Sequence, residues 1–161
     1  QERVPLNSNG CDKIQFLISV NPGEPAKPIA KIASGGELSR IMLAIQTVLS
    51  AHDDLDTMIF DEVDTGISGS AAQKVGLKLH EVSKYAQVIC ITHLAQIACL
   101  ADYHLLIQKQ VTNHKTYTQV IPLSKEAQTK EITRMIGGEA ITPLLLQNAQ
   151  EMIDSAKQLK A

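Results

Sequence analysis

Three short polar clusters in this sequence have residue types and spacings that suit chemistry on phosphate groups. The first, Ser34-Gly35-Gly36-Glu37, directly precedes a run with helical periodicity. A serine followed three residues later by a glutamate is the pattern of a capping box, which satisfies exposed amides at a helix start. The same helix start attracts phosphate, because its amides and dipole are positive and glycine has no side chain to block the approach. Capping and phosphate binding are compatible, so the pattern leaves both open.

The second cluster is the carboxylate pair Asp61-Glu62, which follows the short apolar run Thr57–Phe60. Acids directly after a buried strand lie at the carboxyl end of a sheet, where open α/β folds bind their ligands. Nucleotide hydrolysis needs two acids with different tasks: one holds Mg²⁺, and the other orients or deprotonates the attacking water. An exposed acidic turn is the simpler explanation for an isolated Asp-Glu pair.

The third cluster is a single residue, His93, at the end of a second apolar run over 87–92. A lone histidine after a strand is more often structural than catalytic. Its place one strand further along predicts that it faces the same crevice as Asp61-Glu62. A hydrolase triad of Ser34, His93 and an acid is an alternative, but Ser34 lacks the Gly-x-Ser-x-Gly elbow that such enzymes use.

The elements that must position these clusters alternate between strand and helix. The apolar runs at 57–60 and 87–92 predict parallel strands that are buried on both faces. Ahead of them, we expect a half-buried strand over 13–20, where every second residue is apolar, and a loop over 21–25. A helix with an apolar stripe is expected from Ser34 to about His52, and a second one after the turn at 65–70. The stripe of the first helix comprises Leu38, Ile41, Met42, Ile45, Val48 and Leu49.

Beyond Asp102 the pattern changes to an antiparallel hairpin, with strands at 103–111 and 115–123 around the turn 112–114. A helix over 124–136 is expected to stop at Gly137-Gly138, since glycine commonly ends helices. The last helix begins at Thr142-Pro143, a cap residue followed by proline. We expect that helix to pack on its own domain, rather than to form a coiled-coil seam.

Length and composition predict one soluble domain over residues 1–161. No apolar run approaches the roughly 18 residues of a membrane span, and the first residues do not resemble a signal peptide. The net charge of −2 gives no overall basic footprint for DNA binding. Cys11, Cys90 and Cys99 lack metal-site spacing, so we expect buried, reduced thiols in a cytosolic protein.

The order of the three clusters resembles the C-terminal part of ABC-type ATPase heads. In that family a signature motif opens a helix, a strand ends in the acids of Walker B, and the next strand ends in the switch histidine. Val63-Asp64-Thr65-Gly66 then corresponds to the D-loop. Ala95 is one small departure, since the family pattern leads us to expect proline beside the histidine. Longer stretches are similar to the RecN family of SMC-like DNA-repair proteins, namely 21–25, 33–40, 60–69, 91–98 and 134–139.

The resemblance implies an α/β fold, the C-terminal lobe of a three-layer P-loop NTPase-like head, with parallel strands, flanking helices and an antiparallel hairpin. It also implies two heads that dimerise around two ATP molecules. The expected roles are nucleotide contact in trans for Ser34, Gly35, Gly36 and Glu37, Mg²⁺ binding for Asp61, general base for Glu62, γ-phosphate sensing for His93 and dimer contact for Asp64.

No Gly-x-x-x-x-Gly-Lys-Ser/Thr phosphate loop occurs in the chain. In the RecN family that loop lies near the N-terminus, beyond a long coiled coil, so we expect this chain to be a C-terminal segment. Its expected partners are the N-terminal half of its own head, a second head, and DNA through the full-length protein, with no membrane. The expected function is ATP hydrolysis in repair of DNA double-strand breaks, in the bacterial cytoplasm and under the SOS response. The alternatives are a non-catalytic module with a degenerate ATPase fold and a head segment of another SMC-like protein.

Overall fold

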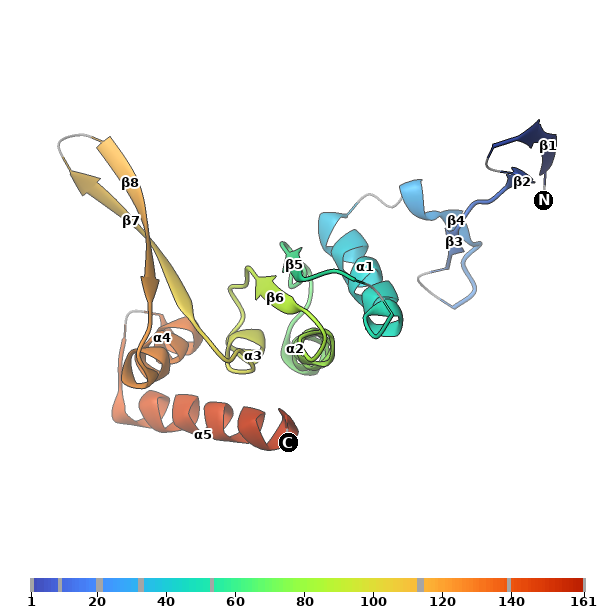
Figure 1. The fold of residues 1–161 in the computed structure, drawn as a ribbon. Coiled ribbons are helices and arrows are strands. Elements are labelled where there is room, and N and C mark those ends of the chain that lie inside the picture. Colours follow the sequence, from blue (N-terminus) through green and yellow to red (C-terminus); the bar gives the residue numbers. More distant parts are fainter. Residues whose placement is uncertain are drawn as a thin grey trace.

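The centre of the molecule is a pair of parallel strands, β5 (Thr57–Phe60) and β6 (Gln87–Cys90) (Figure 1). Thr57 lies opposite Gln87 and Phe60 lies opposite Cys90, so the two strands end level with each other. The structure is a computed structural model that describes residues 2–8, 10–19, 22–31, 34–52, 54–112, 115–138 and 140–160. The parallel pair confirms the α/β class and the two strands expected to carry the polar clusters.

Two helices flank this pair, α1 (Gly35–Leu49) and α2 (Gly69–Val82). The expected cap of α1 is present, because Ser34 has an extended backbone and its Oγ accepts a hydrogen bond from the Glu37 amide at 3.4 Å. The cap fixes the start of α1 at the Gly35-Gly36 pair. The main apolar cluster joins both helices to the sheet and consists of Leu43, Met58, Phe60, Val63, Ala72, Leu79, Val82 and Ile97.

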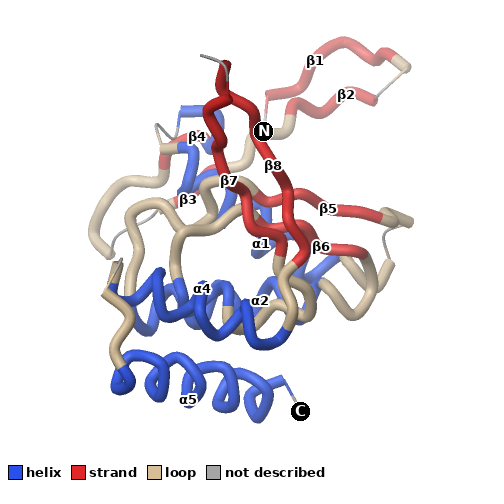
Figure 2. Tube along the Cα trace, turned by 90° about the vertical axis from the view of Figure 1, so that its left-hand side faces the viewer, coloured by secondary structure: helices blue, strands red, loops and turns tan. Residues whose placement is uncertain are grey.

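Burial on both faces of the parallel strands is a wrong prediction. Met58 and Phe60 are 8% and 6% exposed, whereas Ile59 between them is 68% exposed. Ile89 on β6 is also exposed. The physical reason is that the buried side chains pack against α1 and α2, while no described residue covers the opposite face (Figures 1 and 2).

The same one-sidedness holds for α1. Leu43 is its buried apolar side chain, at 3% exposure, and it lies outside the apolar stripe expected from the sequence. Five members of that stripe are exposed: Leu38, Met42, Ile45, Val48 and Leu49. Most of the stripe is therefore left uncovered by the residues that the structure describes.

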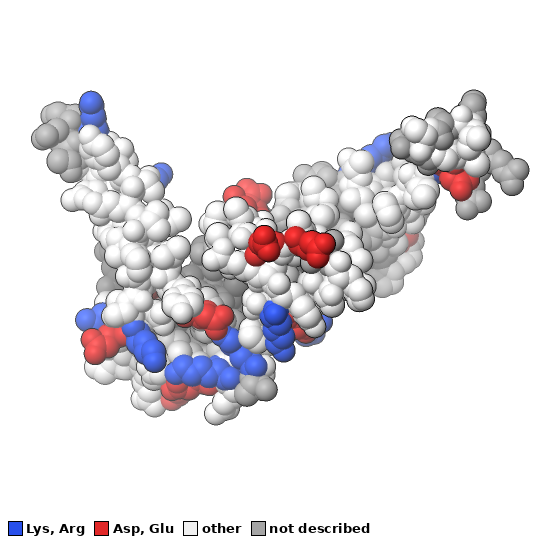
Figure 3. All heavy atoms as spheres, in the orientation of Figure 1, with Lys and Arg blue, Asp and Glu red and all other residues white. Residues whose placement is uncertain are grey.

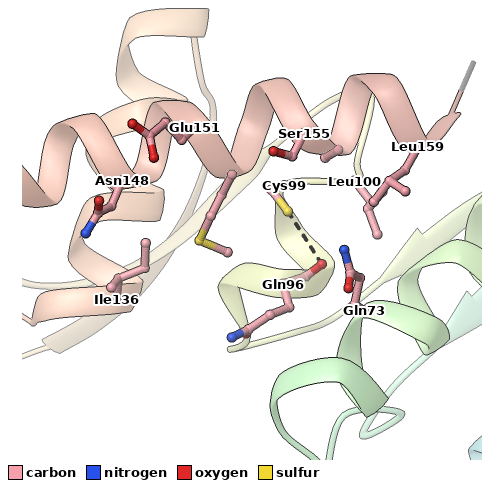
Figure 4. Close-up of a pocket in the computed structure, with 11 residues that line it drawn as sticks. Gln73, Gln96, Cys99, Leu100, Ile136, Asn148, Glu151, Ser155 and Leu159 are labelled. Atoms are coloured by element: carbon pink, nitrogen blue, oxygen red, sulfur yellow. Dashed lines mark hydrogen bonds between the residues drawn. The ribbon is translucent and has the colours of Figure 1, made fainter.

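A second apolar cluster joins α3 (Ala95–Ala98), α4 (Lys125–Gly137) and α5 (Pro143–Lys160). Ser124 caps α4, and Gly138 ends it with φ of 71°, which confirms the expected stop. Ala149 and Ala156 of α5 are buried, so this helix packs on its own domain as expected. An open groove of about 470 Å³ runs along α5, with Gln73, Gln96, Asn148 and Ser155 among its lining residues (Figure 4).

The expected hairpin is also present, formed by β7 (Leu105–Thr112) and β8 (Lys115–Pro122). The strands are antiparallel from Leu105 opposite Pro122 to Thr112 opposite Lys115. Asn113 and His114, which were expected in the turn, lie outside the described residues. The hairpin extends away from the helices at one end of the molecule in Figure 1.

The strand expected over 13–20 is largely wrong. Two short antiparallel pairs occupy this region: β1 (Glu2–Asn7) with β2 (Gly10–Lys13), and β3 (Leu17–Ile18) with β4 (Lys27–Pro28). A 3-10 turn, η1 (Ile29–Lys31), precedes α1. Ile14 and Phe16 are 79% and 73% exposed, so their alternation faces no apolar surface among the described residues. Val20 and Asn21 lie outside the described residues, whereas Pro22–Pro25 forms the expected turn.

The surface carries mixed charge around α4 and α5, where basic and acidic side chains are interspersed (Figure 3). Most of the remaining face in this view is uncharged.

The thiols are only partly as expected, since Cys11 is exposed while Cys90 and Cys99 are half-buried. Within the described ranges, no helix combines the length and apolar character needed to cross a membrane.

Candidate functional site

The acidic pair leaves the end of β5 in a tight turn. The Oδ1 atom of Asp61 accepts a hydrogen bond from the Glu62 amide at 2.8 Å, and the Thr65 amide donates to the Glu62 carbonyl at 3.0 Å. Glu62 has φ of 57°, a left-handed conformation that non-glycine residues rarely adopt. Such strained residues cluster at active sites, where the surrounding contacts hold them in place. Both side chains are exposed and available to a ligand.

The first turns of α1 hold this loop through side-chain to backbone hydrogen bonds. The Ser39 hydroxyl donates to the Asp61 carbonyl at 2.8 Å. The Arg40 guanidinium donates through Nη1 to the carbonyls of Val63 at 3.2 Å and Thr65 at 2.7 Å. Sequence reasoning gave Ser39 and Arg40 no role. They lie in the RecN-like stretch at 33–40, but nothing in their residue types indicates backbone partners more than twenty residues away.

The two glycines at the start of α1 lie against the same loop. A Cβ on Gly36 would come within 2.9 Å of the Glu62 carbonyl oxygen and 3.0 Å of the Thr65 carbonyl oxygen. A Cβ on Gly35 would lie 2.5 Å from Oε2 of Glu62, the far end of a flexible side chain. Gly36 is therefore required by packing on the loop. The Glu62 carboxylate lies beside the positive end of the α1 dipole, which is a favourable place for an anion.

Asp64 joins the acidic loop to the end of β6. Its Oδ2 atom accepts hydrogen bonds from the Thr92 hydroxyl at 2.6 Å and from the His93 amide at 2.9 Å. The same oxygen lies 3.0 Å from Nδ1 of His93, whose side chain is 73% exposed. The Thr92 hydroxyl oxygen also accepts a hydrogen bond from the Leu94 amide at 3.1 Å. Asp64 itself is only 3% exposed, so its carboxylate faces the interior of this chain.

The electrostatics of this region favour an ionised Asp64 carboxylate and a neutral Cys90 thiol. Burial alone would raise the pKa of Asp64, but the hydrogen bonds from Thr92 and the His93 amide, together with the nearby His93 imidazole, lower the pKa below its usual value. Burial raises the pKa of the Cys90 thiol to about 12, and the nearby carboxylates of Asp64 and Asp61 add to this effect. Cys90 is therefore protonated at neutral pH and is not a nucleophile.

The structure thus brings the three polar clusters together at one edge of the sheet. The start of α1 contacts the loop after β5, and that loop binds the residues after β6. Ser34 and His93 are not joined by a hydrogen bond in the described part of the chain: Ser34 caps α1, and His93 lies against Asp64. The geometry therefore provides no support for a hydrolase triad. What it offers is a helix start that is exposed at Gly35, two exposed carboxylates and an exposed imidazole, which together suit a phosphate ester and a metal ion.

No protein-family model matches the chain. The DNA repair protein RecN of Bacillus subtilis (strain 168) is 50% identical over 157 residues, which is 98% of this chain and 27% of that protein. The RecN proteins of Treponema pallidum (strain Nichols) and Vibrio cholerae serotype O1 are 48% and 46% identical over 89% and 97% of this chain. The chain spans about a quarter of the length of these relatives, and it matches their C-terminal part.

A solved structure described as "Structural biochemistry of ATP-driven dimerization and DNA stimulated activation of SMC ATPases" has a TM-score of 0.49 to this chain. The match covers 77% of this chain and 81% of that one, at 24% identity. At this TM-score and identity, the similarity carries no argument about this chain. The RecN proteins, in contrast, align with nearly every residue of this chain, and several of them reach almost half identity. By its sequence, this chain is a homologue of the C-terminal part of the RecN DNA repair proteins, and it spans about a quarter of their length.

Proposed function

We propose that this chain is the C-terminal part of a RecN-type ATPase head and supplies three of the groups that close around ATP. The observation that carries the proposal is the meeting of three motifs at one sheet edge. The loop over 61–65 contacts both the start of α1 and the residues after β6. An acidic turn that served only as a turn would need neither a helix N-terminus nor a histidine beside it.

In this proposal Asp61 holds Mg²⁺, and Glu62 accepts the proton of the attacking water. The exposed carboxylates fit this ion, which prefers oxygen ligands and binds through one or two carboxylates plus substrate phosphates. When bound, Mg²⁺ neutralises charge on the phosphates during their transfer. The described residues contain no group of three or more His, Cys, Asp or Glu side chains that could hold a metal alone. Nucleotide and water would therefore complete the coordination.

Ser34, Gly35, Gly36 and Glu37 are proposed to contact the nucleotide held by the second head of a homodimer. Support comes from the capped, glycine-containing start of α1, a geometry that binds phosphate through backbone amides. Within one chain the Glu62 carboxylate lies beside Gly35, so an incoming phosphate displaces it. Asp64 points inward, and contact between heads at the D-loop would come from its exposed neighbours Thr65 and Gly66.

The phosphate loop is proposed to come from the upstream half of the same head. The uncovered apolar surfaces support this assignment: Ile59 on the sheet and Val48 on α1 are 68% and 75% exposed. Exposed apolar patches of this kind mark interaction sites. In the complete protein, ATP-driven opening and closing of the heads would regulate engagement of broken DNA ends. This last step rests on the resemblance to the RecN family and not on the site.

Isothermal titration of MgATP against the chain, alone and after mixing with the upstream half, tests the proposal. We expect weak binding and no hydrolysis by the chain alone, and tight binding with hydrolysis in the mixture. Ile59→Lys should weaken association with the upstream half about tenfold or more, because a charge would enter the interface. Tyr103→Lys, at a residue that is also exposed but lies outside the β5–β6 pair, serves as the control. Robust Mg²⁺-dependent hydrolysis by the purified chain alone would show that the nucleotide site is misassigned, and a nucleotide-free complex of the two halves would favour a non-catalytic module.

A further inference from the structure

We infer that Asp64 is a positioning residue for His93: it fixes which ring nitrogen carries the proton and turns the other nitrogen outward. The inference rests on the proposed function for its catalytic consequence, because His93 is the group proposed to contact the γ-phosphate. The geometry stands without that function. It places a buried carboxylate of the loop after β5 directly against the ring that follows β6.

One carboxylate oxygen is the centre of the arrangement. Oδ2 of Asp64 accepts from the Thr92 hydroxyl at 2.6 Å and from the His93 amide at 2.9 Å, and it lies 3.0 Å from His93 Nδ1. The first two bonds hold the segment after β6 against the carboxylate. The third contact then fixes the orientation of the imidazole ring, because the backbone amide and Nδ1 of His93 both contact the same carboxylate oxygen.

The protonation of the ring follows from the chemistry of its partner. An ionised carboxylate only accepts hydrogen bonds, so the nitrogen that faces it carries the hydrogen. The depressed pKa of Asp64, caused by its hydrogen-bond donors in spite of burial, keeps the carboxylate ionised at neutral pH. Nδ1 is therefore the protonated nitrogen, and Nε2 is left as the atom available to a ligand. Since the side chain of His93 is 73% exposed, Nε2 can be reached from outside the chain.

Thr92 supports the carboxylate. Its hydroxyl oxygen accepts from the Leu94 amide, which holds the hydroxyl so that its single hydrogen points to Asp64. Removal of this hydroxyl would leave Asp64 with one donor fewer and free to rotate. The orientation of His93 then depends on two residues that touch no substrate, Asp64 and Thr92.

Nitrogen NMR of histidine-labelled full-length protein tests the positioning directly, with the His93 signals assigned by their loss in His93→Gln. We expect the Nδ1-protonated ring in the unmodified protein and a shift towards the Nε2-protonated ring in Asp64→Ala. Thr92→Val should give a partial shift, and Thr92→Ser, which restores a hydroxyl, should recover most of it. Asp154→Asn, at an exposed acid on α5, is the matched control and should leave the His93 signals unchanged. The same His93 proton state in the unmodified protein and in Asp64→Ala would overturn the inference.

A double-mutant cycle on ATP hydrolysis separates the inference from the proposed function. Hydrogen-bond partners of metal-ligating histidines contribute about tenfold to a hundredfold in affinity or activity, and we expect a similar factor for this pair. Asp64→Ala should lower kcat by about that factor in the unmodified background and have almost no further effect in a His93→Ala background. An equal loss of kcat in both backgrounds would refute positioning through His93. Full hydrolysis by His93→Ala would refute the proposed role of His93, while the NMR experiment still decides whether Asp64 fixes its ring.

Discussion

At the scale of single residues, the two neighbouring acids after β5 have different surroundings. Asp61 turns its Oδ1 back onto the Glu62 amide, and its carbonyl accepts from Ser39. Glu62 adopts a left-handed backbone that sends its carboxylate to the start of α1. The two carboxylates therefore have different partners, the Glu62 amide for Asp61 and the start of α1 for Glu62. Substitution of each acid in turn should therefore give different results.

Glu62→Gln in the full-length protein should lower ATP hydrolysis by about 10²–10⁴, because glutamine keeps the size of the side chain but cannot accept the proton of water. MgATP binding should remain intact. Asp61→Asn should instead weaken binding of the metal–nucleotide complex, since the metal loses a charged ligand. Steady-state hydrolysis and equilibrium binding of MgATP measure the contrast, with Glu126→Gln on α4 as the control. If both substitutions do little, the pair is only an acidic turn.

At the scale of elements, the site depends on how closely α1 approaches the loop over 61–65. Arg40 donates to two carbonyls of that loop, and Gly36 allows its backbone to come close. The helix start and the acids are therefore one packed unit. Motion of α1 would change the position of Glu62 as well as the position of the signature motif.

Gly36→Ala should destabilise this unit by about 1–3 kcal/mol, the usual effect of forcing an extra carbon into a packed site. The added Cβ would meet the carbonyl oxygens of Glu62 and Thr65, which belong to the backbone and cannot rotate away. Gly35→Ala is the matched control, because its Cβ would meet only the mobile end of the Glu62 side chain. Urea unfolding of the chain, followed by circular dichroism, compares the two variants. Equal destabilisation by both would show that the close approach at Gly36 is not what stabilises the loop.

Local elements were predictable where short-range chemistry decides them. Ser34 and Ser124 cap helices, Gly138 ends one, and strands form over 57–60 and over the first four residues of the apolar run at 87–92. The strand expected over 13–20 is largely absent. Alternating apolar side chains predict a buried strand face only where another surface covers them, and Ile14 and Phe16 are exposed. The gathering of the polar clusters followed from strand order, but the inward carboxylate of Asp64 depends on tertiary contacts that residue type does not indicate.

At the scale of the whole molecule, apolar side chains are buried on one face of the β5–β6 pair, while apolar side chains on the other face and on α1 are exposed. The described residues form two apolar clusters, which meet at α3 through Ile97 and Ala95. The uncovered face of the β5–β6 pair and the uncovered stripe of α1 leave room for further structure (Figures 1 and 2). The chain spans 27% of the RecN protein of Bacillus subtilis, and we propose that the upstream part of such a protein covers these surfaces. The proposed site is accordingly shared among three parts: this chain, its upstream half and a second head.

The central claim is that the start of α1 acts on a nucleotide held by another subunit. The most direct measurement uses Ser34→Cys in full-length protein whose own phosphate-loop lysine has been removed, and an ATP analogue with a thiol-reactive γ-phosphate. This protein is mixed with a second one that has an intact phosphate loop and an unchanged Ser34. A parallel mixture in which both proteins retain Ser34 gives the background labelling of Cys11, Cys90 and Cys99. We predict that position 34 is labelled only in the mixture, on the subunit that cannot bind nucleotide itself. Labelling only when the thiol and the intact phosphate loop lie on the same chain would contradict the account.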